Sequence, residues 1–260
     1  MISRVNINVA NIRSEPNDRS ERLTQALYYE TVEILEEKDN WLKVRLPDPY
    51  VGWLRKPFAG EPEINSVATP FHIIVGLAPA LEQPEITSRH KTFIPYCCEI
   101  IGKEVNDFVQ LVSQRYGTMY IPTSCVETVT QFQRTAAEWR SIFQLECEKF
   151  LGVPYLWGGK SFFGIDCSGF SQTVMRRFGI ALPRDSKDQI NSGVPVDREN
   201  IVMGGLLFFP RHVAIALGND IFIHSSVSNG GVAINSFDKN SKFYNEYLDK
   251  SFICARRVFQ

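Results

Sequence analysis

Apolar and polar residues alternate in short runs through the first part of the chain, with the two-residue period of half-buried β-strands. We predict strands at Val5–Ile12, Val32–Leu35, Trp41–Leu46 and Val51–Leu54. Runs rich in Ser, Asn, Asp and Pro separate these strands, as is typical of turns. Short strands at such regular spacing predict a small all-β barrel over residues 1–62.

The same pattern recurs farther along the chain. A run that starts at Ile100 repeats the pattern of the run that starts at Ile34, with one inserted residue. Two pairs of aromatic residues keep a common spacing of twelve positions, Trp41 with Trp53 and Phe108 with Tyr120. Internal repetition predicts a second, degenerate barrel over residues 66–128.

The period then changes to that of a helix. Thr135 and Glu138 have the spacing of a capping box, which opens a predicted helix. Gly152 and Pro154 are expected to end it. Its apolar face is predicted to consist of Trp139, Phe143, Cys147, Phe150 and Leu151.

A second helix is predicted to begin directly after Asp166, a good N-cap residue. Its apolar residues at helical spacing are Cys167, Phe170, Val174 and Phe178. This places Cys167 in the first turn, where free backbone N–H groups and the helix dipole favour a thiolate. A buried structural cysteine is the alternative interpretation of this motif taken alone.

The last part of the chain returns to β patterns after a loop at Leu182–Gln189 that leads into a short helix. Strands are predicted at Leu206–Phe209, His212–Leu217, Ile221–Ser226, Gly231–Ile234 and Phe252–Val258. Helices followed by an antiparallel sheet predict an α+β domain over residues 135–260.

Two histidines lie on a predicted hairpin of this sheet. With a three-residue turn at Gly218–Asp220, His224 lies opposite Ala214, and His212 is its diagonal neighbour on the same face. A two-residue turn would place the two imidazoles on opposite faces.

Composition narrows the classes of function. The formal net charge is -1, with 22% charged and 44% hydrophobic residues, so neither nucleic acid nor an anionic membrane is an expected partner. The longest apolar run, Ile73–Leu81, is broken by Gly76 and Pro79 and is too short to span a bilayer. Six cysteines without a C-x-x-C pair, and no recognisable secretion signal, predict a cytoplasmic protein with reduced thiols. Processing of a longer precursor, and action in the periplasm or cell wall, are alternatives.

Nucleophilic thiol chemistry needs a base and a group that orients the base. Cys167, His212 and His224 supply these parts in that order. A Cys-His-His zinc site is the competing chemistry, but no fourth ligand is evident. We therefore expect neither a metal nor another cofactor.

Six motifs between about residues 150 and 258 resemble, in order, those of the NlpC-type cysteine peptidases, which have a papain-like fold. The motifs are Pro154-Tyr-Leu-Trp-Gly-Gly, Asp166-Cys-Ser-Gly-Phe, Leu182-Pro-Arg-Asp-Ser-Lys-Asp-Gln, Leu207-Phe-Phe, His212-Val-Ala-Ile and Ile223-His-Ser. This resemblance implies that Cys167 is the nucleophile, His212 the general base and acid, and His224 the orienting residue. It also implies that Tyr155 helps to bind the oxyanion beside the backbone N–H of Cys167.

One position departs from the family pattern. The family usually has Pro-Gly-Asp-Leu before the Phe-rich strand, whereas this chain has Met203-Gly-Gly-Leu, with Gly205 in place of the Asp. Because this Asp is not one of the three catalytic residues, the departure concerns the local turn.

The N-terminal segment resembles the bacterial SH3-like domain in the runs that begin at Asn8, Trp41 and Gly52. With two such domains in front of the peptidase domain, the chain resembles the γ-D-glutamyl-L-diamino acid endopeptidases of murein-peptide processing. That resemblance implies a murein-derived peptide substrate, L-Ala-γ-D-Glu-diamino acid, with a free amino terminus. The substrate-binding residues that it implies are Glu15, Tyr50, Trp157, Asp166, Ser168, Asp185 and Ser186.

The sequence thus predicts two small SH3-like barrels followed by an α+β papain-like peptidase domain that hydrolyses the D-γ-Glu–diamino acid bond. The alternatives are acyl transfer by the same Cys-His groups, hydrolysis of the intact sacculus, and a cell-wall-binding protein with a silent peptidase domain.

Overall fold

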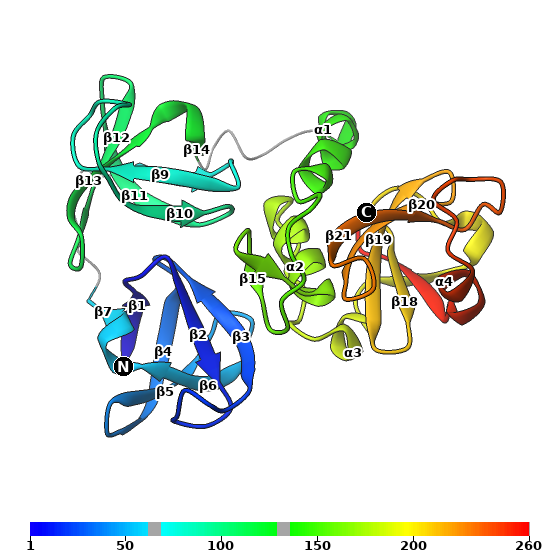
Figure 1. The fold of residues 1–260 in the computed structure, drawn as a ribbon, viewed down its shortest axis with the longest axis horizontal. Coiled ribbons are helices and arrows are strands. Elements are labelled where there is room, and N and C mark those ends of the chain that lie inside the picture. Colours follow the sequence, from blue (N-terminus) through cyan, green and yellow to red (C-terminus); the bar gives the residue numbers. More distant parts are fainter. Residues whose placement is uncertain (62–68, 129–135, 260) are drawn as a thin grey trace. The chain divides into compact units, whose positions relative to one another are not determined.

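The computed structural model describes residues 1–61, 69–128 and 136–259. The chain divides into two compact units, residues 1–133 and residues 134–260. The first unit consists of strands and single turns of 3-10 helix, and the second combines helices with a sheet (Figure 1). A multidomain chain with an all-β N-terminal region and an α+β C-terminal region is therefore confirmed.

The first unit opens with a seven-stranded antiparallel sheet in the order β3-β2-β6-β5-β4-β1-β7. The bounds are β1 Ile2–Val5, β2 Val9–Arg13, β3 Arg22–Leu27, β4 Thr31–Lys38, β5 Trp41–Arg45, β6 Val51–Arg55, η1 Lys56–Phe58 and β7 Ala59–Gly60. The single strand predicted at Val5–Ile12 is wrong, because the chain turns between β1 and β2. There the Asn8 side chain accepts a hydrogen bond from the Val9 backbone N–H at 2.9 Å, a local contact that competes with strand pairing.

A second seven-stranded antiparallel sheet follows, in the order β10-β9-β13-β12-β11-β8-β14. The bounds are β8 Thr69–Ile73, β9 Leu77–Leu81, β10 His90–Pro95, β11 Glu99–Val105, β12 Phe108–Ser113, β13 Gly117–Pro122, η2 Thr123–Cys125 and β14 Val126–Thr128. Adding seven to each strand number of the first sheet gives the order of the second. The internal repeat predicted from the sequence is therefore present strand by strand. In neither sheet does any described pairing join the two edge strands.

The repeat extends to the loops. Glu15 and Gln83 occupy equivalent places in the β2–β3 and β9–β10 loops, and the N–H of each donates to a serine hydroxyl five residues later, at 3.3 and 3.0 Å. The backbone carbonyl of each also accepts a bond from the residue two positions later. The two loops thus have the same backbone hydrogen bonds, but the side chain at this position is charged in the first loop, Glu15, and neutral in the second, Gln83.

Each sheet encloses an apolar cluster. The first contains Val5, Ala10, Ile12, Ala26, Val32, Leu42, Val44, Leu46 and Leu54. The second contains Phe71, Ile73, Ala78, Ala80, Ile94, Cys98, Ile100, Val109, Leu111, Met119, Ile121 and Val126, together with Leu27 and Tyr28 from the first copy. Alternate strand residues supply these clusters, as expected for a half-buried sheet.

The second unit is built on a six-stranded antiparallel sheet in the order β17-β22-β18-β19-β20-β21. Its strands are β17 Val194–Val196, β18 Leu206–Phe209, β19 His212–Gly218, β20 Ile221–Ser226, β21 Gly231–Ser236 and β22 Cys254–Arg257. The other elements are α1 Ala136–Glu148, β15 Lys160–Ser161, β16 Gly164–Ile165, α2 Cys167–Arg177, α3 Ser186–Gln189, η4 Arg198–Asn200 and α4 Glu246–Ser251. All five predicted strands are present, with ends shifted by up to two residues, whereas β17 and α4 were not predicted.

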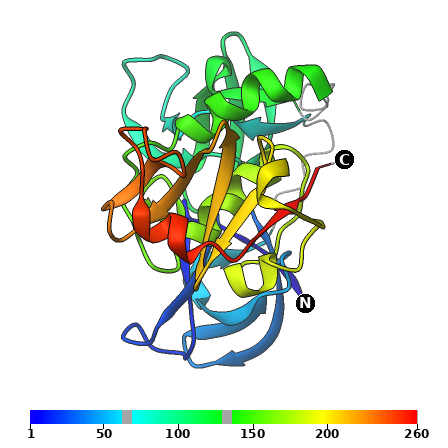
Figure 2. The ribbon, with the colours of Figure 1, turned by 90° about the vertical axis from the view of Figure 1, so that its right-hand side faces the viewer.

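The helices α2 and α4 lie on opposite faces of this sheet in both ribbon views (Figures 1 and 2). The face that packs on α4 carries Leu207, Phe209, Ala214, Ala216 and Phe222, together with Leu248 of the helix. Buried residues of the other parity, including Phe208, Val213, Ile215 and Ile223, face the opposite side. The sheet is thus buried on both faces, which explains why its strands read as continuous apolar runs.

The predicted apolar face of α1 is only partly correct. Phe143, Cys147 and Phe150 are fully buried, but Leu151 is 44% exposed, because the helix ends at Glu148 and the chain then turns. Thr135, the first residue of the predicted capping box, lies outside the described residues.

The turn that contains Gly205 is formed without the family's Asp. The Gly205 N–H donates to the Val202 carbonyl at 3.0 Å, and Gly204 adopts φ +84°. A Cβ on Gly204 would lie 2.5 Å from the Phe259 ring and 2.7 Å from Trp139, so this position requires glycine.

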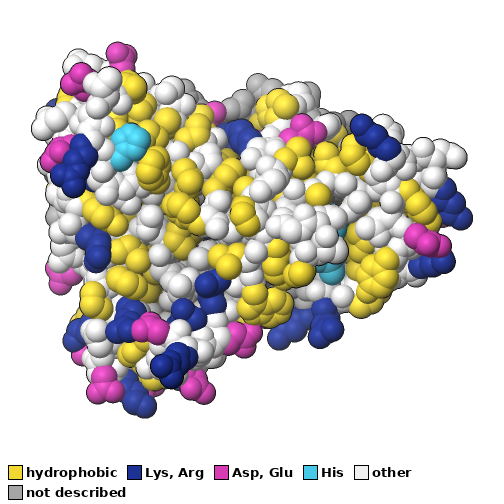
Figure 3. Space-filling model, viewed as in Figure 1, with side chains coloured by type: hydrophobic (Ala, Val, Ile, Leu, Met, Phe, Trp, Pro, Cys, Tyr) yellow, Lys and Arg dark blue, Asp and Glu magenta, His cyan; other side chains and the backbone are white. Residues whose placement is uncertain are grey.

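Two surface features bear on the predicted partners. No helix within residues 1–61, 69–128 and 136–259 is long and apolar enough to cross a bilayer. Lys and Arg side chains are interspersed with Asp and Glu side chains over the visible face (Figure 3). This mixture matches the formal net charge of -1.

Candidate active site

The start of α2 is fixed by its N-cap. One carboxylate oxygen of Asp166 accepts a bond from the Gly169 N–H at 2.7 Å, which confirms the predicted helix start. A Cβ on Gly169 would lie 2.2 Å from the Gly159 carbonyl oxygen, so the first turn of the helix packs directly on the preceding loop. Cys167 is therefore held in the first turn by contacts on both sides.

A buried ion pair closes this turn from the other side. Arg184, 2% exposed, binds both oxygens of Asp166, at 3.0 Å from Nη1 and 2.7 Å from Nη2. The same guanidinium donates to the Ser168 hydroxyl at 2.9 Å and to the Gly159 carbonyl at 3.2 Å. Asp166 also accepts from the Gly158 N–H at 2.8 Å. These partners belong to the Gly158–Gly159 loop and to the first turn of α2. The pair therefore holds the backbone around the nucleophile in place.

Arg184 was not among the predicted site residues. Arg184 lies inside the Leu182–Gln189 motif, which could have pointed to it, but only Asp185 and Ser186 of this motif were assigned a role. Gln189 of the same motif donates to the carbonyls of Ser168 and Pro183 at 3.0 and 2.8 Å. The motif therefore anchors α3 to the start of α2.

Cys167 is 8% exposed, and the backbone groups of Val213 and Ser168 lie near its sulfur, where they act to lower its pKa. Burial, and secondly the Asp166 charge, raise the pKa of Cys167 to about 11. The expectation that the helix start favours a thiolate is thus reversed, because the loss of hydration outweighs the backbone N–H groups. The sulfur therefore lies beside the backbone of Val213, the residue that follows His212.

Tyr155 lies close to the same sulfur. Burial, followed by the charges of Cys167 and Asp166, raises the pKa of the Tyr155 hydroxyl to about 12. The hydroxyl therefore stays protonated and able to donate a hydrogen bond at neutral pH.

The hairpin that carries the histidines has a two-residue turn. Gly218 pairs with Ile221, and Asn219 and Asp220 have φ of +51° and +61°, as in a type I′ turn. The predicted three-residue turn is therefore wrong. The register also shifts between Ala216 and Gly218, where one extra residue forms a bulge.

The extra residue of this bulge compensates for the shorter turn. Beyond the bulge, the two strands pair in the register that the sequence predicted. Ile215 pairs with Ile223, and the same register continued by one residue aligns Ala214 with His224. The two imidazoles consequently lie on one face of the sheet, as predicted.

The imidazoles are bonded to one another. His212 Nε2 lies 2.8 Å from His224 Nδ1, and His224 Nε2 lies 2.8 Å from Asn235 Oδ1. The rings of Phe209 and Phe222 pack beside them, at centroid distances of 5.9 and 5.7 Å. Burial lowers the pKa of His212 to about 3, with the neighbouring His224 as a second cause, and burial also lowers the pKa of His224. Both rings are neutral at neutral pH.

Asn235 was missed by the sequence interpretation. It lies on β21, where it pairs with Phe222 of β20. No motif marks it, and only the strand register brings it beside His224.

The arrangement disfavours a zinc site. Two of the four imidazole nitrogens face each other at 2.8 Å and are not open to a metal. Within the part of the chain that the structure describes, no group of three or more His, Cys, Asp or Glu side chains could hold a metal ion.

The other predicted substrate residues are placed differently. Trp157 is 62% exposed beside the start of β15. Asp185 is close enough to Arg184 that its charge raises the pKa of that guanidinium, although burial acts more strongly in the opposite direction. Ser186 begins α3. Asp166 and Ser168 are buried, and their polar side-chain atoms are bonded within the protein.

Glu15 and Tyr50 belong to the first unit. Glu15 is exposed, and Asn17 donates to its carboxylate at 3.3 Å. Arg13, the last residue of β2, pairs with Trp53 of the antiparallel strand β6. The residues that follow β2 and those that precede β6 therefore lie at the same end of these two strands. This register brings the two residues to neighbouring loops.

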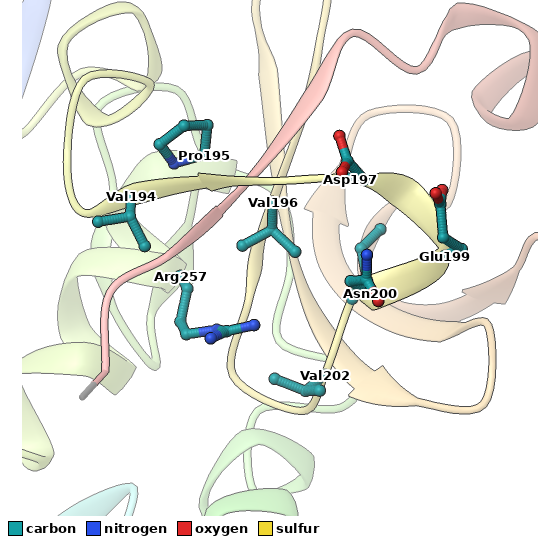
Figure 4. Close-up of a pocket in the computed structure, with 9 residues that line it drawn as sticks. Val194, Pro195, Val196, Asp197, Glu199, Asn200, Val202 and Arg257 are labelled. Carbon is teal, nitrogen blue, oxygen red and sulfur yellow. The ribbon is translucent and has the colours of Figure 1, made fainter.

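A separate hollow of about 470 Å³ opens at the edge strand β17 (Figure 4). The side chains of Val194 and Val196 project to the same side of this strand, toward Val202 and Arg257. None of the predicted site residues lines it.

Comparison with known proteins agrees with these observations. Residues 152–257 match the model of the NlpC/P60 family, and residues 12–56 match that of the bacterial dipeptidyl-peptidase Sh3 domain. A γ-D-glutamyl-L-lysine dipeptidyl-peptidase of Bacillus subtilis is 31% identical over 91% of this chain and 81% of its own length. Dipeptidyl-peptidase 6 of Lysinibacillus sphaericus is 28% identical over 96% and 97% of the two chains.

The fold also matches a solved structure. The crystal structure of an NlpC/P60 family protein from Bacillus cereus superposes with a TM-score of 0.83 over 99% of both chains, at 21% identity. The 31% identity to the Bacillus subtilis relative, together with the match of residues 152–257 to the family model, identifies the chain as a member of the NlpC/P60 family.

Proposed function

We propose that this protein is a cysteine peptidase that hydrolyses the bond between D-γ-Glu and the diamino acid of murein peptides. The observation that carries the proposal is a thiol in a helix first turn, beside the backbone of the residue that follows His212, with His212 bonded to His224 at 2.8 Å. The names of the relatives, γ-D-glutamyl-L-lysine dipeptidyl-peptidases, support this bond as the target.

In the first half of the reaction, His212 accepts the thiol proton as the Cys167 sulfur attacks the γ-carbonyl carbon. The resulting oxyanion accepts hydrogen bonds from the Tyr155 hydroxyl and the Cys167 backbone N–H. The tetrahedral species then breaks the C–N bond, and His212 returns the proton to the leaving amine. A thioester on Cys167 remains.

In the second half, His212 takes a proton from water, whose oxygen attacks the thioester carbonyl. The C–S bond breaks, the sulfur regains the proton from His212, and the dipeptide L-Ala-γ-D-Glu leaves. The thiol proton leaves on the amine and a water proton replaces it on the sulfur, so the enzyme regains its starting state and no cofactor is required. His224 orients the His212 ring throughout.

For substrate recognition, we propose that Glu15 and Tyr50 bind the free amino group of L-Ala. Their neighbouring positions and the exposure of Glu15 support this role. Asp185, Ser186 and Trp157 are proposed to contact the substrate from the catalytic domain. Because Asp166 and Ser168 are buried and internally bonded, we assign them to holding the first turn of α2.

At the level of domains, we propose SH3-like barrels over residues 1–62 and 66–128, and a papain-like peptidase domain over residues 135–260. The identical strand order of the two sheets supports the paired barrels. We further propose a cytoplasmic site of action, which cell fractionation tests directly.

The proposal is tested by mass spectrometry on L-Ala-γ-D-Glu-L-Lys and its diaminopimelate counterpart. The expected product is L-Ala-γ-D-Glu, and Cys167→Ala should form none. Turnover by that variant would refute the thiol mechanism. An added amine that is incorporated into the product would indicate acyl transfer, and binding to sacculi without any turnover would indicate a wall-binding protein.

A further inference from the structure

The hydrogen-bonded chain from His212 to His224 continues to a third side chain, Asn235. We propose that Asn235 is a positioning residue that fixes the tautomers of both histidines and so leaves His212 Nδ1 unprotonated as the base toward Cys167. This inference rests on the proposed function, in which His212 accepts the thiol proton.

The argument starts from the orientation of the Asn235 amide. Its nitrogen donates to the backbone carbonyl of Phe243 at 3.2 Å, and a carbonyl can only accept. Its oxygen accepts from the Asn229 side-chain nitrogen at 3.0 Å. A flipped amide would place two oxygens face to face at Phe243 and two nitrogens face to face at Asn229. The oxygen of Asn235 therefore points to His224.

The amide oxygen then dictates the proton positions along the chain. Asn229 Nδ2 lies 3.5 Å from His224 Nε2, but this amide donates to Asn235 Oδ1 at the shorter distance of 3.0 Å. Because Asn235 Oδ1 can only accept, His224 Nε2 carries the proton of its neutral ring. His224 Nδ1 is consequently an acceptor, and the bond of 2.8 Å requires a proton on His212 Nε2. The remaining nitrogen of His212, Nδ1, has a free lone pair.

The opposite tautomer would disable the site. If His224 carried its proton on Nδ1, His212 Nε2 would have to accept, and the His212 proton would move to Nδ1. Nδ1, the nitrogen proposed as the base, would then carry a proton, and the ring would have no lone pair to accept the thiol proton. Burial keeps both rings neutral, so each ring holds one proton whose position must be chosen. Asn235 makes that choice.

The first test needs no mutation. With ¹⁵N-labelled histidine, NMR chemical shifts distinguish a protonated from an unprotonated ring nitrogen in the wild-type protein. The expected pattern is protonated Nε2 and unprotonated Nδ1 on both His212 and His224. Protonated Nδ1 on either ring would overturn the proposal, whether or not the enzyme turns over any substrate.

The second test uses variants. Asn235→Leu, which has a similar volume but no acceptor, should lower kcat about tenfold or more with little change in KM, since it removes orientation of the base. The same variant should show mixed tautomers in the NMR spectrum. Asn235→Asp keeps an oxygen acceptor and, assayed at alkaline pH, should retain the wild-type tautomers and more of kcat than Asn235→Leu.

Asn245→Ala is the matched control. Asn245 caps α4 by accepting from the Leu248 N–H at 3.0 Å, so its loss lowers stability without changing a contact of the histidines. It should leave kcat and the tautomers unchanged. Wild-type kcat with unaltered tautomers in Asn235→Leu would refute the proposal. By contrast, turnover by Cys167→Ala would refute the proposed function and leave the tautomer result standing.

Discussion

At the scale of single residues, burial controls the protonation of the site. It raises the pKa of Cys167 to about 11 and lowers that of His212 to about 3, so both the thiol and the imidazole are uncharged in the resting protein. The proton must then move as the sulfur attacks. The pH dependence of the thiol and of stability both follow from these values.

Alkylation of Cys167 should report its raised pKa. Because only the thiolate reacts, the labelling rate with iodoacetamide should rise about tenfold per pH unit from neutral pH toward the pKa of about 11. The rate is measured on the Cys167 peptide by mass spectrometry, since other cysteines also react. A plateau below pH 8 would instead indicate a preformed thiolate–imidazolium pair.

The two histidines should differ in their effect on turnover. His212→Ala removes the base and should lower kcat about 10²- to 10⁴-fold. His224→Ala removes only orientation and should cost less. Steady-state kinetics on the tripeptide gives both values, and equal small losses would contradict the assigned roles.

The free energy of unfolding should decrease as the pH falls below 6.5. The folded pKa of His212 lies below its ordinary value of 6.5, so protonation favours the unfolded state. This contribution to the free energy of unfolding is present above pH 6.5 and is lost progressively as the pH falls toward 3. Urea titrations over this range should show a steeper loss for wild type than for His212→Gln. Parallel curves would argue against a buried neutral ring.

At the scale of elements, the first turn of α2 depends on the buried Asp166–Arg184 pair. Removing one partner of a buried ion pair leaves an uncompensated charge, which is far more costly than losing a solvated pair. The pair also shares its hydrogen bonds with Ser168 and with the Gly158–Gly159 loop. Disturbing it should therefore move the nucleophile as well as lower stability.

Arg184→Met should lower the free energy of unfolding by about 3–5 kcal/mol. It should also reduce kcat, because the loop that holds Cys167 loses four hydrogen bonds from the guanidinium. Lys250→Ala is the control, since it breaks the exposed pair with Glu246 and should leave both quantities unchanged. A stable and fully active Arg184→Met would show that the pair is dispensable.

At the scale of the whole molecule, the two all-β copies share strand order and loop geometry but differ in charge. Glu15 in the first copy is replaced by Gln83 in the second, on the same loop backbone. Only the first copy therefore offers a carboxylate to an ammonium group at this position. Substrate choice should depend on the first copy.

Glu15→Gln should raise KM for L-Ala-γ-D-Glu-diamino acid peptides but leave alkylation of Cys167 unchanged. Acetylation of the substrate amine should lower kcat/KM of wild type about a hundredfold, because a charge-assisted pair worth a few kcal/mol is lost. Glu85→Gln, in the equivalent loop of the second copy, is the control and should not alter KM. Similar kcat/KM for free and acetylated tripeptides would refute amine recognition.

The sequence by itself determined most elements and the residues of the proposed triad. Period-two and period-3.6 patterns predicted five strands of the second unit, and Asp166 marked the start of α2, because N-caps and alternation are local signals. The repeat was also readable, since both copies keep the same aromatic spacing. The break between β1 and β2 was missed because a local side-chain hydrogen bond at Asn8, and not the apolar pattern, marks the turn that precedes β2.

Only the tertiary structure decided the register and the electrostatics. A bulge beside Gly218 returns the imidazoles to one face after a turn that would have separated them, and Asn235 bonds to His224 from the neighbouring strand β21. Arg184, which lies 18 positions after Asp166 in the sequence, neutralises the charge of this carboxylate. Burial then reverses the effect of the helix dipole on Cys167, because hydration depends on every element that surrounds the sulfur, which no local sequence pattern records.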